Sequence, residues 1–86
     1  MDISSIGILR IEFWKAPDEA FLPRNVVAAG IDHSISWLEA KATHGGGPLM
    51  RKYGRRVLYC KKDVLVWLSE NFRPIAHTSE LAIVNK

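Results

Sequence analysis

The chain has 86 residues, 48% of them hydrophobic and 24% charged, which suffices for one domain and is too apolar for a disordered chain. A domain this small buries roughly 60% of its unfolded surface, so we expect no deep catalytic pocket. The single Cys60 excludes an internal disulfide framework and favours a reducing, intracellular compartment. The net charge of +3 is too mild to identify a partner, and we predict neither a membrane span nor a signal peptide.

The first predicted element is a β-strand over residues 6–14. Leu9, Ile11 and Phe13 alternate with Ile8, Arg10 and Glu12, which is the two-residue period of a strand. Pro17 then breaks the pattern. We therefore assign residues 1–16 to an N-terminal strand or arm that precedes the main domain.

Two short helices joined by a tight turn are predicted next. Pro23 can occupy the first turn of a helix through residue 29, and Gly30 ends that helix. The second helix begins near Ser34, or as late as Ser36, because Ser36 and Glu39 have the spacing of a capping box. It ends at the three glycines of residues 45–47.

The second helix is predicted to have one face that packs and one that stays outside. At about 100° per residue, Ile35, Leu38 and Ala42 share the packing face with Ile31. The outward residues are small or polar, with one aromatic side chain and a basic edge: His33, Ser34, Ser36, Trp37, Ala40, Lys41 and His44. Small side chains on that face allow a close approach to another surface.

A β-hairpin is predicted over residues 49–59, with its turn at Tyr53 and Gly54 because glycine tolerates the positive φ of a tight turn. A third helix from residue 61 or 62 to about residue 71 carries an apolar stripe. Pro74 ends it, and residues 73–86 form a C-terminal tail. The predicted core of this half of the chain consists of Leu58, Val64, Trp67 and Leu68.

The basic residues gather in one part of the chain. No acidic residue lies between Glu39 and Asp63, whereas seven of the twelve basic residues do: Lys41, Arg51, Lys52, Arg55, Arg56, Lys61 and Lys62. The rest of the chain has five basic and nine acidic side chains, a net charge of −4. One positive region on a small protein suits a polyanion such as nucleic acid.

Two helices joined by a tight turn, followed by a basic hairpin, make a helix-turn-helix with a wing. In such a module the second helix lies in the DNA major groove, so the outward residues listed above are the candidate recognition surface. Arginines at a hairpin tip can pair with phosphates. The candidate wing contacts are Arg51, Lys52, Arg55 and Arg56.

Residues 45–68 also contain a dense run of motif residues. Gly45 to Pro48 is followed by a basic residue, Gly-Arg-Arg-Val-x-Tyr over residues 54–59, an Asp-hydrophobic pair at residue 63 and a Trp-hydrophobic pair at residue 67. This run resembles the signature of excisionase-type winged helix-turn-helix proteins, and the resemblance extends over about residues 22–71. The implied fold class is α+β, a small winged helix-turn-helix over residues 17–72 with an additional N-terminal strand.

The resemblance implies a DNA-bending excisionase, also called a recombination directionality factor, that helps a tyrosine integrase excise a mobile element. The implied partners are double-stranded DNA at the attachment-site region, the integrase and further copies of the chain along the DNA. The implied location is the nucleoid in the cytoplasm. An alternative within the same resemblance is a transcriptional regulator of the AlpA or MerR-like type.

Other interpretations remain open at the level of the sequence. Arg55 and Arg56 can instead be solubilising charges on an exposed turn. Trp37 can stack on sugar and phosphate, or it can pack against the N-terminal strand. A different class of function is a protein-interaction adaptor whose basic face meets an acidic partner. For self-association, the candidate surfaces are the strand over residues 6–13 and the apolar part of the tail, residues 81–84.

We predict no enzymatic activity, no cofactor and no metal site. His33, His44 and Cys60 lack the spacing of metal ligands. No nucleophile is paired with a base in any recognisable motif. The glycines at residues 45–47 are not followed by the Gly-Lys-Ser/Thr of a phosphate loop, so we interpret them as a linker between helix and wing.

Overall fold

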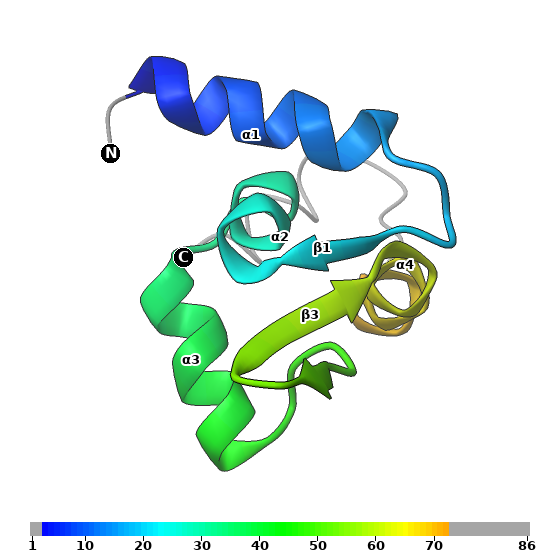
Figure 1. Ribbon diagram of the computed structural model, residues 1–86. Helices are drawn as coiled ribbons and strands as arrows, with labels where there is room; N and C mark the ends of the chain where they lie inside the picture. The colour runs from blue at the N-terminus through cyan, green and yellow to red at the C-terminus, as the bar shows by residue number, and fades with distance from the viewer. Residues whose placement is uncertain (1–2, 73–86) are drawn as a thin grey trace, which may run out of the picture.

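The computed structural model describes residues 3–72 and shows a small α+β domain, compatible with a winged-helix-like fold (Figure 1). Within these residues, four helices surround a three-stranded antiparallel sheet. The elements in chain order are α1 (Ile3–Lys15), β1 (Phe21–Pro23), α2 (Arg24–Gly30), α3 (Ile35–His44), β2 (Arg51–Tyr53), β3 (Arg56–Cys60) and α4 (Lys61–Asn71). The predicted tail, residues 73–86, lies outside the described residues.

The predicted N-terminal strand is wrong, because residues 3–15 form helix α1. Leu9, Phe13 and Ala16 recur at three- and four-residue spacing and face the core, where Phe13 is fully buried. Apolar residues also stand at the intervening positions, so the same segment satisfies a two-residue period. The local sequence pattern fits both a helix and a strand. The packing of this segment against α2 selects the helix.

Helix α1 packs closely on α2 because residue 30 has no side chain. A Cβ atom on Gly30 would lie 2.3 Å from Cγ of Phe13. The Nε atom of Arg10 donates a hydrogen bond to the carbonyl of Ala29 at 3.1 Å, and Nε1 of Trp14 donates to the carbonyl of Gly30 at 3.0 Å. Helix α1 therefore satisfies carbonyls that the last turn of α2 leaves without helical partners.

The sheet has the order β1-β3-β2, and its register decides which side chains enter the core. Leu22 lies opposite Tyr59, and both are buried. Residues that are directly opposite share a face, and successive residues alternate. Leu58 therefore points to the outer face, so its predicted place in the core is wrong. Tyr59 occupies that place instead, alongside the correctly predicted Val64 and Leu68.

The hairpin and the third predicted helix form as expected, with small shifts. The turn falls at Gly54 and Arg55, one residue later than predicted, and Gly54 has a φ of 62°. Helix α4 spans Lys61–Asn71, within the predicted limits. Trp67 packs on the edge of the core and remains partly exposed. The short strand β1 was not predicted, because three residues give no measurable alternation.

Lys61 is a buried lysine that joins α4 to the end of α1. Its side chain is only 5% exposed, and Nζ donates to the carbonyls of Trp14 at 3.0 Å and Ala16 at 2.7 Å. The same atom lies 5.6 Å from the ring centroids of Phe13 and Trp14. A positive charge at the C-terminus of a helix and over aromatic faces is favourable. Lys61 is therefore a structural residue, unlike its exposed neighbour Lys62.

We expect Lys61→Met to lower the free energy of unfolding by about 1–3 kcal/mol, because methionine fills the site but leaves two carbonyls without a donor. Urea unfolding followed by circular dichroism measures the change. Lys62→Met is the matched control, with an expected change below about 0.5 kcal/mol. Equal stability of the two variants would contradict the structural role of Lys61.

Candidate nucleic-acid interface

The turn between α2 and α3 is fixed by the backbone and by α1. The amide of His33 donates to the carbonyl of Ala28 at 2.9 Å, and that of Asp32 donates to Ala29 at 3.4 Å, which is the bonding pattern of a Schellman motif. Asp32 has a positive φ of 65°, and its carboxylate is 2.6 Å from the guanidinium of Arg10. This set of contacts fixes the path of the chain from α2 into α3.

Helix α3 begins at the earlier of its two predicted starts. Oγ of Ser34 accepts a hydrogen bond from the amide of Trp37 at 3.0 Å, which makes Ser34 the N-cap. Ser36 lies inside the helix and is exposed. Ser34 thus has a structural role at the start of α3, while the side chain of Ser36 is exposed on the helix surface.

The exposed arc of α3 lies opposite the buried Leu38. Ser36, Ala40 and His44 are exposed on this arc, in agreement with their predicted outward position. Glu39 and Thr43 are exposed as well and were missed, although the same count of 100° per residue places Thr43 about 20° from Ser36. Small side chains at the centre of the arc let the helix approach a surface closely.

Trp37 is partly buried and packs toward α4, so its predicted packing against the N-terminal segment is wrong. Its stacking on sugar and phosphate stays a prediction. Its ring stacks on His33 with centroids 3.7 Å apart and meets Trp67 of α4 edge-on at 5.8 Å. Nζ of Lys41 lies 5.4 Å from the same ring. Trp67 also donates from Nε1 to the carbonyl of Gly46 at 3.0 Å. His33, Trp37 and Lys41 thus form a cluster on the side of α3 that faces α4.

The wing arginines differ from one another in their surroundings. Arg55 and Arg56 are exposed at the hairpin turn, and Lys52 is exposed beside them. Within residues 3–72 none of the three forms an ion pair. Arg51 lies 3.6 Å from Asp63 of α4, so part of its charge is offset. The tip of the hairpin is therefore its most strongly positive part.

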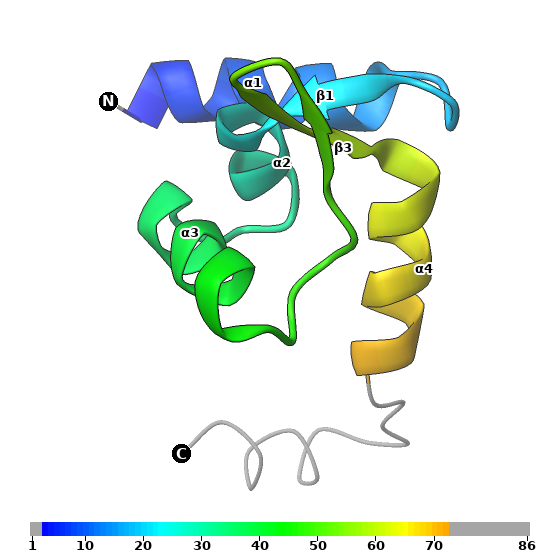
Figure 2. The ribbon, with the colours of Figure 1, turned by 60° about the horizontal axis from the view of Figure 1, so that its bottom comes forward.

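Helix α3 and the hairpin lie on the same side of the molecule. In Figure 1, α3 and the start of β3 lie in the lower half, with α1 at the top. Figure 2 brings the lower side forward and shows the hairpin passing in front of α1, with its turn well separated from α3. The hairpin turn and the exposed face of α3 thus lie on one side of the molecule but apart from each other, and they do not form one continuous surface.

Arg24 connects this side of the molecule to the core. Its Nε donates to the hydroxyl of Tyr59 at 3.2 Å, and its guanidinium lies 3.8 Å from Glu39 on α3. The three residues come from α2, β3 and α3. These contacts connect α3 to β3 through Arg24 and so help to fix the position of the exposed arc of α3.

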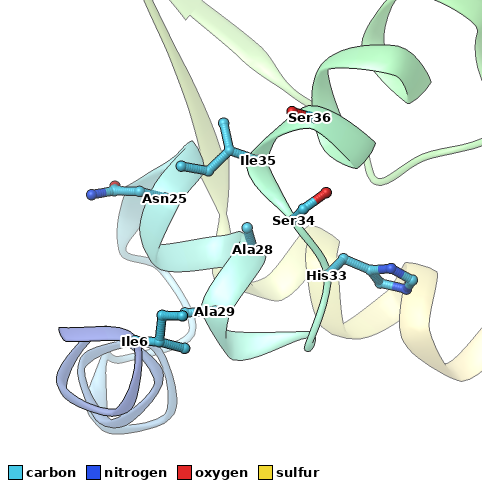
Figure 3. A pocket seen from close by; sticks show the side chains of 8 residues that line it. All are labelled: Ile6, Asn25, Ala28, Ala29, His33, Ser34, Ile35 and Ser36. Carbon is cyan, nitrogen blue, oxygen red and sulfur yellow. The ribbon is translucent and has the colours of Figure 1, made fainter. Parts of the chain in front are cut away.

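A shallow hollow of about 230 Å³ lies between α1, α2 and the start of α3 (Figure 3). Its wall is mostly apolar, from Ile6, Ala28, Ala29 and Ile35. Among residues 3–72 no three His, Cys, Asp or Glu side chains are close enough to hold a metal ion. In the same part of the chain no helix is both long and apolar enough to cross a membrane. The other residues that line the hollow are polar: Asn25, His33, Ser34 and Ser36.

Comparison with known proteins gives no relative: no protein-family model matches the chain, and no curated protein matches it. The geometry of α3 and the hairpin, together with the motif residues of the sequence, is therefore what supports a function.

We expect Ser34→Ala to destabilise the protein by about 1 kcal/mol, because the amide of Trp37 loses its acceptor at the start of α3. Ser36→Ala is the matched control inside the same helix and should change stability by less than about 0.5 kcal/mol. Thermal unfolding of both variants checks the difference. A larger loss for Ser36→Ala would place the cap at Ser36.

Proposed function

We propose that the protein is a sequence-specific, DNA-bending winged-helix protein that acts as an excisionase in integrase-mediated excision of a mobile element. The observation that carries the proposal is the shared side of α3 and the arginine-tipped hairpin, opposite α1. The motif residues over 45–68 support the same assignment. The partners proposed with it are the attachment-site DNA and a tyrosine integrase.

In this proposal α3 enters the major groove with Ser36, Ala40 and His44 toward the bases. Small side chains allow close approach, and hydroxyl and imidazole groups can hydrogen-bond base edges. Arg55 and Arg56 contact phosphates or the adjacent minor groove from the separated hairpin turn. Two spaced contacts on one side of the protein suit a duplex bent toward it, because bending brings the second contact within reach.

Self-association along the DNA is part of the same proposal. Ile8 and Ile11 of α1 are 65% and 56% exposed, one helical turn apart, on an element opposite α3. Exposed apolar pairs of this kind are candidate contacts between protein molecules. The tail residues 81–84, the other surface suggested by the sequence, lie outside the described residues.

We expect binding to a labelled random-sequence duplex to weaken with salt, with a slope of log K against log salt of about −4 to −5 for roughly four to six neutralised phosphates. The double variant Arg55→Gln, Arg56→Gln should reduce the magnitude of that slope by roughly one to two. Fluorescence anisotropy across salt concentrations measures both. Lys15→Gln on α1 removes a charge on the far side and should leave the slope unchanged.

An absence of duplex binding at low salt would contradict the proposal and favour a protein-interaction adaptor. For a DNA-binding protein, an in vitro excision reaction with the element's integrase separates the two remaining candidates. An excisionase should raise the yield of excised product severalfold over integrase alone, and the double arginine variant should not. Duplex binding with no effect on excision would instead support a transcriptional regulator.

A further inference from the structure

The outer face of the sheet carries a groove whose apolar wall has no part in the proposed DNA binding. It has a volume of about 430 Å³ and is lined by Phe21 of β1, Leu58 of β3, and Arg51, Lys52 and Tyr53 of β2. Phe21 is 53% exposed and Tyr53 is 75% exposed. Two large aromatic side chains are thus exposed to solvent beside a half-buried leucine. The opposite face of the sheet, in contrast, packs on the core.

The register explains why these residues share the outer face. Arg51 lies directly opposite Leu58, and Phe21 lies opposite Cys60, two residues further along β3. Leu22 and Tyr59 occupy the alternate positions and enter the core, which also contains Leu38 of α3. The groove therefore faces away from the core, and α3 lies on the core side. A molecule in the groove and a duplex on α3 would contact different faces.

The groove is basic as well as apolar. Strands β1, β2 and β3 contain Arg51, Lys52 and Arg56 and no acidic residue. Asp63 of α4 approaches this region and lies 3.6 Å from Arg51. Arg56, which shares the outer face with Leu58, forms no ion pair within the described part of the chain. An occupant that complements the groove must offer negative charge next to bulky apolar groups.

We propose that this groove binds an acidic peptide segment with aliphatic or aromatic anchors, contributed by a protein partner. Aromatic residues and arginine are the side chains enriched where proteins bind each other. The anchors would cover Phe21, Leu58 and Tyr53, and the carboxylates would meet Arg51 and Arg56, which share the outer face with Leu58. A nucleic acid fits less well, because its backbone has a phosphate at every nucleotide and the groove is mostly apolar.

The proposal rests on the sheet and not on the proposed function, so the two can fail separately. The test uses the full chain labelled with ¹⁵N and a fluorescein-labelled amphipathic peptide made only of Asp, Glu, Leu and Phe. We expect saturable binding and amide shifts confined to β1, β2 and β3. Phe21→Ser should weaken peptide binding about tenfold and leave duplex binding unchanged.

Two controls make the result specific to the groove. Phe72→Ser removes another aromatic side chain, 71% exposed and outside the groove, and should bind the peptide as the unmodified protein does. A peptide with lysine in place of each acidic residue should not bind. Equal binding by Phe21→Ser, or shifts centred on α1 and α2, would overturn the proposal. Strand shifts caused by single-stranded DNA but not by the acidic peptide would overturn it in favour of nucleic acid.

Discussion

Phe13 reaches the backbone of α2 only because residue 30 has no side chain. The ring is fully buried, and a methyl group at position 30 would overlap it. Around this contact, Arg10 and Trp14 donate to the end of α2, while Lys61 donates to the end of α1. Each helix terminus in this part of the core is therefore completed by a side chain from another element.

The same contacts determine where the candidate interface lies. Arg10 binds both the end of α2 and the carboxylate of Asp32, whose positive φ turns the chain into α3. Arg24 then links α3 to β3 through Glu39 and Tyr59. A change in the packing of α1 would thus reach α3 through the contacts of Arg10 with Ala29 and Asp32, without touching the exposed arc directly.

The molecule presents two surfaces of different chemistry. The side with α3 and the hairpin turn offers small polar side chains and the exposed Arg55 and Arg56, which suits a polar, highly charged duplex. The outer face of the sheet offers Phe21 and Tyr53 around Leu58, which suits an apolar anchor. The core separates α3 from that outer face, so the two surfaces lie on different faces of one small domain.

The amino-acid sequence by itself determined α2, α3, the basic hairpin and α4, because glycine stops and helical apolar spacing are local signals. The capping-box spacing at Ser36 pointed two residues past the N-cap, which is Ser34. It also identified the wing arginines. Only the tertiary structure decided that residues 3–15 are helical, because their apolar residues fit both the two-residue period of a strand and the spacing of a helix. The packing of Phe13 on Gly30 selects the helix. It likewise decided that Trp37 turns toward Trp67 and that Leu58 faces outward, because partners distant in sequence fix both.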